Sequence, residues 1–352
     1  MSDRPRHPNS TSRRNMLKLA GFALTTPALL RASWAAAEQP VTYVGWGGAA
    51  EEASRAAVID PFIKETGIAV QIVSGPDLSK ARGQVMSGQI EWDVINTAGF
   101  VMTSGEEAGI WETLPPDLVP ASDLKVPMRK SSAPFMQYAG VMAYAPGRSG
   151  DKFPRTFKDF FDPDNFPGRR GLRTYAGQTL EMALLADGVP PQSLYPLDVE
   201  RAFAKLDKMK PHVAKWIEQT QQTISLLQNG EIDFSFTYNG RVESARASGI
   251  DIDFSRDQSL ILTQYLAVLK GSPRAEKAFK LISYFMDPAR QAELSRLYFS
   301  IPTRISAKGL IRPEIAARLP DLSNPNNVLM NDTWWADHQI ELDRRFKEWL
   351  AT

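Results

Sequence analysis

Residues 41–75 read VTYVGWGGAAEEASRAAVIDPFIKETGIAVQIVSG, and this stretch decides the fold class. Residues 41–46 predict a short strand that ends at two glycines. The apolar residues of 49–67 recur at helical spacing up to Gly67, and the β-branched residues of 68–75 predict a second strand. Two strands joined by a helix through short connections are typical of a parallel sheet that is covered by helices.

The same kind of pattern continues along the chain. Further helices are predicted in 77–89, 196–211 and 274–300, where a break falls at Asp287-Pro288, and further strands in 92–96, 140–147 and 260–272. Residues 151–172 are dense in Pro, Asp and Phe, which we interpret as the beginning of a second lobe. A chain of 352 residues exceeds the usual size of one domain, so we expect an α/β protein of two domains.

The N-terminal residues have the features of an export signal. Residues 12–18, Ser-Arg-Arg-Asn-Met-Leu-Lys, resemble the twin-arginine motif, and Ala35 and Ala37 form an A-x-A cleavage site after a weakly apolar run. That run is shorter than the roughly 20 apolar residues of a membrane-spanning helix, and the chain has no cysteine for a lipid anchor. We therefore predict a twin-arginine signal peptide in 1–37, cleavage near Ala37 and a periplasmic location.

Charge and histidine content argue against several functions. The predicted leader holds six of the 41 Lys and Arg residues and one of the 40 Asp and Glu residues, so the mature chain has a net charge of −4. This mildly acidic balance favours neither nucleic acid nor an anionic membrane as a partner. Only His212 and His338 remain in the mature chain, which gives Ser–His or zinc chemistry little support. We predict no metal, no cofactor and no enzymatic activity, and keep a secreted carboxylate-based enzyme as a remote alternative.

Several segments together resemble a known family. They include TYVGWGG (42–48), KARGQVMSGQIEWDVIN (80–96), EMALLADG (181–188), LYPLDVERAFAKLDKMKPHV (194–213), LLQNGEIDFSFTYNGR (226–241) and AFKLISYFMDPARQAELS (278–295). The chain resembles the periplasmic solute-binding proteins of ABC transporters, in the spermidine/putrescine-binding group of extracellular solute-binding family 1. The resemblance covers essentially the whole mature chain.

The resemblance implies a two-lobed periplasmic-binding-protein fold of type II, with mixed, mostly parallel sheets and a ligand cleft between the lobes. Lobe 1 would comprise 38–137 and 264–302, and lobe 2 would comprise 138–263 and 303–352. Crossing segments are expected near Gln137–Gly140, Leu262–Tyr265 and Ile301–Thr303. Closure of the lobes traps a ligand because it makes contacts that the open state lacks. The expected partners are a small solute and the permease–ATPase complex at the inner membrane, and the expected state is a monomer.

The resemblance also implies a binding site. In spermidine/putrescine binders, aromatic rings flank the methylene chain and carboxylates hold the ammonium ends. The ligand-binding residues that we predict here are Trp46, Gly47, Gly48, Thr97, Phe100, Gln137, Tyr175, Gln178, Tyr238, Arg241, Gln264 and Trp335. Gly47 and Gly48 are included because glycines leave backbone amides open to a ligand.

This chain departs from the polyamine pattern at the acidic positions. Gly48, Tyr175, Gln178 and Gln264 stand where the resemblance leads us to expect acids. Three arginines, Arg173, Arg241 and Arg304, lie close to segments expected at the cleft, and each has the geometry to grip a carboxylate. We expect import of a small amine-bearing, spermidine/putrescine-like solute. The alternative is an amino-acid-like or acid-bearing solute, for example a γ-aminobutyrate-like one.

Overall fold

The computed structural model describes residues 39–352. The predicted signal peptide, with its twin-arginine motif and the cleavage site near Ala37, lies outside the described residues. Among the helices of 39–352, none combines the length and the apolar character that crossing a membrane requires.

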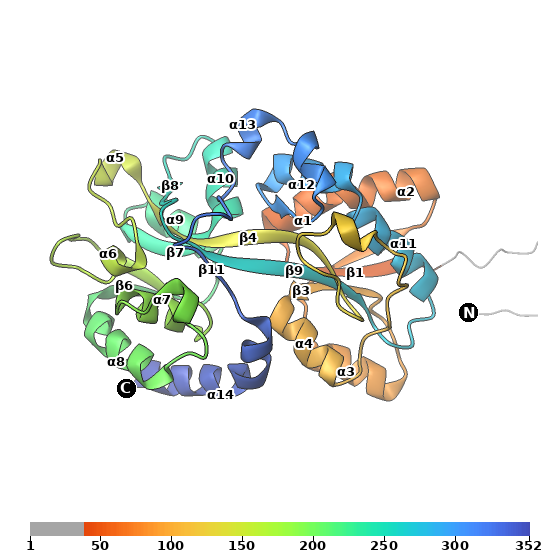
Figure 1. The fold of residues 1–352 in the computed structure, drawn as a ribbon, viewed down its shortest axis with the longest axis horizontal. Helices are drawn as coiled ribbons and strands as arrows, with labels where there is room; N and C mark the ends of the chain where they lie inside the picture. The colour runs from red at the N-terminus through yellow and green to blue at the C-terminus, as the bar shows by residue number, and fades with distance from the viewer. Residues whose placement is uncertain (1–38) are drawn as a thin grey trace, which may run out of the picture. The chain divides into compact units, whose positions relative to one another are not determined.

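The first elements follow the predicted alternation of strands and helices (Figure 1). They are β1 (Val41–Gly45), α1 (Gly48–Ser54), α2 (Asp60–Thr66), β2 (Val70–Ser74), α3 (Leu78–Ser87), β3 (Val94–Ala98) and α4 (Gly99–Glu107). The helix predicted over 49–67 is confirmed, and one π-helical turn at Arg55–Ile59 joins α1 to α2. Gly67 ends α2 with a φ of 70°, a left-handed conformation that glycine adopts readily.

The rest of the chain alternates in the same way. The elements are β4 (Ala133–Tyr144), α5 (Pro146–Ser149), α6 (Phe157–Phe160), β5 (Arg170–Arg173), α7 (Thr179–Ala186), α8 (Val199–Met209), β6 (Val213–Ile217), α9 (Gln222–Gln228), β7 (Phe234–Tyr238), α10 (Asn239–Ala247), β8 (Asp253–Phe254), β9 (Leu260–Val268), α11 (Ala275–Phe285), α12 (Pro288–Tyr298), β10 (Ile301–Pro302), α13 (Pro313–Ala316), β11 (Val328–Leu329) and α14 (Asp332–Ala351). The predicted break at Asp287-Pro288 is confirmed, since Asp287 caps α12 by accepting hydrogen bonds from the amides of Ala289 and Arg290. Strand β4 begins earlier than predicted, at Ala133.

All strands belong to one mixed sheet of order β2-β1-β3-β9-β4-β7-β5-β6, with β8 and β10 on β4 and β11 on β9. The outer strands pair in parallel, β1 with β2 and β3 at one end, and β5 with β6 and β7 at the other. The long strands β4 and β9 pair antiparallel and run between these two groups (Figure 1). The two-lobed α/β fold predicted from the sequence is confirmed.

The three expected crossing segments lie side by side. Gln137 of β4 is paired with Thr263 of β9 on one side and with Ile301 of β10 on the other. The division into lobes at 137/138, 263/264 and 302/303 follows these positions and stays a prediction.

Helix α14 packs against elements that belong to both groups of parallel strands. Its buried residues Trp335, Leu342 and Phe346 pack in the apolar core that also contains α7 and α8. The N-terminal end of α14 packs against α4, which follows β3 in the other group (Figure 1). Helix α14 therefore packs against helices that belong to both groups.

Candidate ligand-binding site

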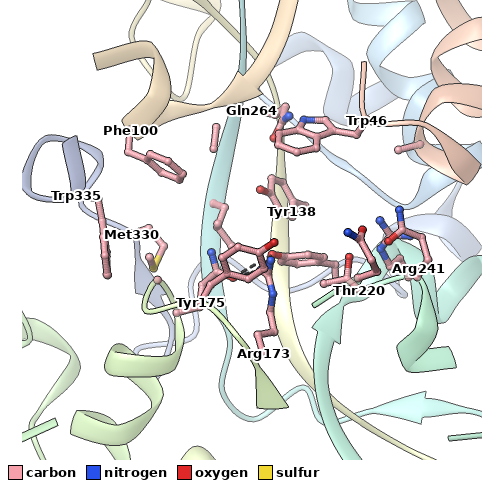
Figure 2. Close-up of a pocket in the computed structure, with 18 of the residues that line it drawn as sticks. Trp46, Phe100, Tyr138, Arg173, Tyr175, Thr220, Arg241, Gln264, Met330 and Trp335 are labelled. Carbon is pink, nitrogen blue, oxygen red and sulfur yellow. Dashed lines mark hydrogen bonds between the residues drawn. The ribbon is translucent and has the colours of Figure 1, made fainter. Parts of the chain in front are cut away.

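A cavity of about 330 Å³ lies beside the crossing strands (Figure 2). Its walls come from the end of β1, the start of α4, the middle of β4 and β9, the β5–α7 turn, the loop after β6, the start of α10, and α14. Phe100, Met330 and Trp335 lie on one side of the view, and Trp46, Thr220 and Arg241 lie on the other. A cavity of this size suits a small organic ligand.

Most of the residues predicted from the sequence meet in this cavity. Those that line it are Trp46, Phe100, Tyr175, Gln178, Tyr238, Arg241, Gln264 and Trp335. They come from six separate segments of the chain, which the fold brings together mostly at strand ends and helix starts. Their role in binding a ligand stays a prediction.

Four predicted residues, Gly47, Gly48, Thr97 and Gln137, are not among the residues that line the cavity. The amide of Gly47 is not open to a ligand, because it donates to Glu51 Oε2 at 3.1 Å. Thr97 and Gln137 are buried in the sheet, and Gln137 Nε2 donates to Thr263 Oγ1 at 3.2 Å. Gln137 therefore joins β4 to β9, the two long strands that run between the groups of parallel strands.

Arg173 enters the cavity at the end of β5 within a polar network. Its Nη1 donates to Gln178 Oε1 at 2.8 Å and to the hydroxyl of Tyr238, and the Tyr238 hydroxyl donates to Gln178 Oε1 at 2.9 Å. The guanidinium also lies over the ring of Tyr175, 4.8 Å from its centroid. Gln178 has a φ of 70°, which is uncommon for a residue other than glycine and is typical of functional sites.

Arg173 and Arg241 share an unusual property. The Nε atom of each guanidinium is buried without a hydrogen-bond partner. Neither arginine belongs to any ion pair within residues 39–352, although both line the cavity. Within the described residues, the cavity therefore contains two guanidinium groups that have no carboxylate at ion-pair distance.

Arg304 does not line the cavity, although the sequence analysis expected it close to the cleft. Its Nε donates to Asp123 Oδ2 at 2.7 Å and its Nη1 donates to the carbonyl of Met286 at 2.8 Å. Hydrogen bonds from the Ser306 hydroxyl and amide, followed by the contact with Arg304, lower the pKa of Asp123 to about 2. Arg304 is outside the cavity because it ties the segment after β10 to residues near 123.

The apolar part of the cavity is aromatic. Trp46 is 46% exposed, and Tyr138 and Tyr238 pack edge to face with ring centroids 5.3 Å apart. Burial raises the pKa of Tyr138, so its hydroxyl remains protonated in the physiological range. Phe100 and Trp335 complete the wall. Such rings bind methylene groups and also attract an ammonium group through their faces.

The negative groups of the cavity include Asp343 on α14. Its Oδ1 accepts from the amide of Ala176 at 3.2 Å and its Oδ2 accepts from Gln339 Nε2 at 3.3 Å. Burial raises the pKa of Asp343, while its two hydrogen bonds and the charges of Lys347 and Arg173 act in the opposite direction. Glu218 is the second acidic residue of the lining.

Residues 57–318 match the family described as bacterial extracellular solute-binding protein. The chain belongs to this family. The chain is also similar to an ABC transporter substrate-binding protein of Bradyrhizobium japonicum, with 35% identity, a TM-score of 0.83, and coverage of 88% of this chain and 99% of that structure. It is thus the substrate-binding component of an ABC importer, and the proteins that it resembles are solute-binding transport proteins.

Two curated relatives differ in their ligands. The γ-aminobutyric acid-binding protein of Pseudomonas aeruginosa is 32% identical over 95% of this chain and 96% of its own length. Spermidine/putrescine-binding periplasmic protein 1 of Haemophilus influenzae is 25% identical over 80% of each chain. The polyamine group suggested by the sequence motifs is therefore a more distant relation than the first of these proteins.

Several lining residues of this solute-binding protein were missed in the sequence. They are Ala50, Ala98, Met136, Tyr138, Gly177, Glu218, Gln219, Thr220, Gln221, Leu262, Tyr298, Met330, Gln339 and Asp343. Residues 218–221 directly follow β6, which pairs in parallel with β5. Ligands collect at the carboxyl ends of parallel strands, so this rule, applied to β6, identifies the 218–221 loop. No comparable signal marks Asp343, which lies within a helix.

Proposed function

We propose that this solute-binding protein captures a small amino-acid-like solute that carries a carboxylate, such as γ-aminobutyrate, and delivers it to an ABC permease. The observation that carries the proposal is the pair of cavity arginines, Arg173 and Arg241, which take part in no ion pair within residues 39–352.

A ligand carboxylate supplies what these two side chains lack. Burying a charged group without a partner is costly, and a guanidinium offers parallel N–H donors that match the two oxygens of a carboxylate. The Nε atoms of Arg173 and Arg241 are buried and without partners, so the hydrogen-bonding capacity of neither guanidinium is filled within residues 39–352. A polyamine would bring further positive charge to both arginines.

The remainder of the cavity suits an ammonium group on a short apolar chain. The aromatic rings of Trp46, Phe100 and Tyr138 provide faces for methylene groups and for a cation. Asp343 provides a carboxylate whose raised pKa would fall again if an ammonium group bound beside it. A zwitterion with separated charges uses both parts of the cavity.

The relatives support the same choice of ligand. The relative named for γ-aminobutyric acid matches this chain over nearly its full length, whereas the polyamine binder matches less of it at lower identity. From the predicted signal peptide and the family, we infer a monomer that works in the periplasm and is exported by the twin-arginine route. Closure of the lobes around the ligand would then present the loaded protein to the permease.

Substitution of Arg241 tests the proposal. Arg241→Met keeps the apolar stem and removes the charge, and the buried Nε of Arg241 has no hydrogen-bond partner to lose. Loss of a charged hydrogen-bond pair is expected to weaken γ-aminobutyrate binding about 10- to 100-fold in isothermal titration calorimetry. Arg344→Met, which removes an exposed charge far along α14, serves as the matched control. Unchanged affinity of the Arg241 variant for γ-aminobutyrate would refute the role of this cation.

A further inference from the structure

A buried carboxylate lies directly behind the cavity wall. Glu181 of α7 is fully buried, and it belongs to no ion pair within the described residues. Its Oε1 accepts hydrogen bonds from Trp335 Nε1 at 2.5 Å and from the Tyr195 hydroxyl at 2.6 Å, while Oε2 is buried without a partner. Burying a carboxylate is costly, and the hydrogen bonds from these two donors offset part of that cost.

The two donors connect Glu181 to the cavity. Trp335 lines the cavity with its ring, and Tyr195 also contacts Met330, a second lining residue, through a hydroxyl–sulfur distance of 3.6 Å. Trp335 and Met330 lie more than a hundred residues away from Glu181 in the sequence. Glu181 is therefore the point at which α7 holds the segment that leads into α14.

The edge of Trp335 has one polar anchor. The ring packs edge to face against Trp334, with centroids 5.2 Å apart, and its only polar atom, Nε1, is the one bonded to Glu181. Apolar contacts fix the position of an indole but leave its rotation about the side-chain bonds less well determined. A hydrogen bond at the ring edge selects one orientation.

We propose that Glu181 is a positioning residue that fixes the orientation of the Trp335 ring in the cavity wall and thereby determines how tightly the ligand is held. The inference rests on the proposed function, in that the cavity is the ligand site. Without the acceptor, the indole N–H and the Tyr195 hydroxyl become buried donors that must turn to find partners, and the wall facing the ligand changes shape. A wall that is already in its bound shape loses less conformational entropy on binding.

Glu181→Gln and Glu181→Leu separate the acceptor from the charge. The glutamine retains an oxygen for both donors, whereas leucine fills a similar volume and offers no acceptor. With γ-aminobutyrate as the probe in calorimetry, we expect Glu181→Leu to weaken binding about tenfold and Glu181→Gln to remain within about threefold of the original. Equal losses in both variants, or no loss in Glu181→Leu, would overturn the proposal.

A double-mutant cycle assigns the effect to Trp335. Trp335→Phe removes the indole N–H, so adding Glu181→Leu to it is expected to change affinity less than about threefold. The same tenfold loss on both backgrounds would show that Glu181 acts by another route and would overturn the proposal. Tyr195→Phe removes the other donor and keeps Trp335 bonded, so its affinity for γ-aminobutyrate is expected to lie near that of the original protein.

An indole signal tests the positioning without any ligand. In ¹⁵N-tryptophan-labelled protein, the Nε1–H resonance that disappears in Trp335→Phe is expected to exchange slowly with solvent in the original and in Glu181→Gln, and to shift and exchange faster in Glu181→Leu. An unchanged resonance in Glu181→Leu would overturn the proposal. If γ-aminobutyrate fails to bind the original protein, the proposed function fails, whereas this resonance still reports on Glu181.

Discussion

Asp332 is expected to make the stability of the protein depend on pH in an unusual direction. Asp332 is the first residue of α14, its side chain is 18% exposed, and its Oδ2 lies 3.0 Å from Arg129 Nη2. Burial raises the pKa of the carboxyl group to about 6, with Arg129 acting in the opposite direction. The cost of desolvation thus exceeds the attraction of the ion pair, as is common for buried pairs.

The size of the effect follows from the difference between two pKa values. An aspartate in the unfolded chain has a pKa of about 3.9, so the folded state binds a proton more tightly between about pH 4 and pH 6. The contribution of this group to stability is present below pH 4 and is lost as the pH rises through 6. A difference of about 2 in pKa corresponds to about 3 kcal/mol.

Asp332→Asn removes this titration and keeps the shape of the side chain. The free energy of unfolding, measured by urea denaturation, is expected to rise relative to the original protein by about 3 kcal/mol more at about pH 7.5 than at about pH 4. Asp337→Asn removes an exposed negative charge from the same helix and controls for the change in net charge. A difference that does not vary with pH would show that Arg129 and the N-terminus of α14 keep the carboxylate ionised, and would refute the reasoning.

Three further outcomes are expected. Gly99→Ala would place a Cβ 1.9 Å from Asp332 Oδ2, so it is expected to force α4 and α14 apart and to lower both the Tm and the affinity for γ-aminobutyrate. Gly83→Ala in α3, where a Cβ meets nothing within 4 Å, is the control and is expected to stabilise by up to about 1 kcal/mol; a Tm of Gly99→Ala equal to that of the original would contradict the packing. Glu243→Gln removes the buried carboxylate shared by Arg246, Arg256 and Arg318, and is expected to lower the free energy of unfolding by about 3 kcal/mol in urea titrations. A change below about 1 kcal/mol would exclude this cluster as a major contributor to stability. Trp46→Ala is expected to weaken γ-aminobutyrate about tenfold in calorimetry with little change in Tm, because the ring is half exposed; unchanged affinity would remove it from the site.

Local patterns predicted much of the fold, and long-range pairing explains what they missed. Gly67 and Asp287-Pro288 mark helix ends through backbone chemistry that acts within a few residues. The first part of β4 was missed because Pro134 and Gln137 interrupt the apolar pattern of a strand. That part is held by β9 and β10, which follow more than a hundred residues later, and no local window contains this information.

In the candidate site, too, local patterns predicted some residues and long-range packing explains those that were missed. Trp46 and Phe100 were predicted from the family resemblance and from their places at the end of one predicted strand and in the turn after another, since ligands collect at the carboxyl ends of such strands. Arg304 was misplaced because its partner Asp123 lies 181 residues away, and only the folded chain shows that the two form an ion pair. Asp343 was missed because its position on α14 becomes relevant only where this helix packs beside the cavity.

The central claim is that the cavity holds a solute with a carboxylate group. Calorimetric titration of the mature protein with γ-aminobutyrate and, separately, with putrescine tests it most directly, since the two differ in charge at one end of a similar chain. We predict that γ-aminobutyrate binds at least about tenfold more tightly than putrescine, a difference of about 1.4 kcal/mol. Tighter binding of putrescine would contradict the assignment of Arg173 and Arg241 to a ligand carboxylate.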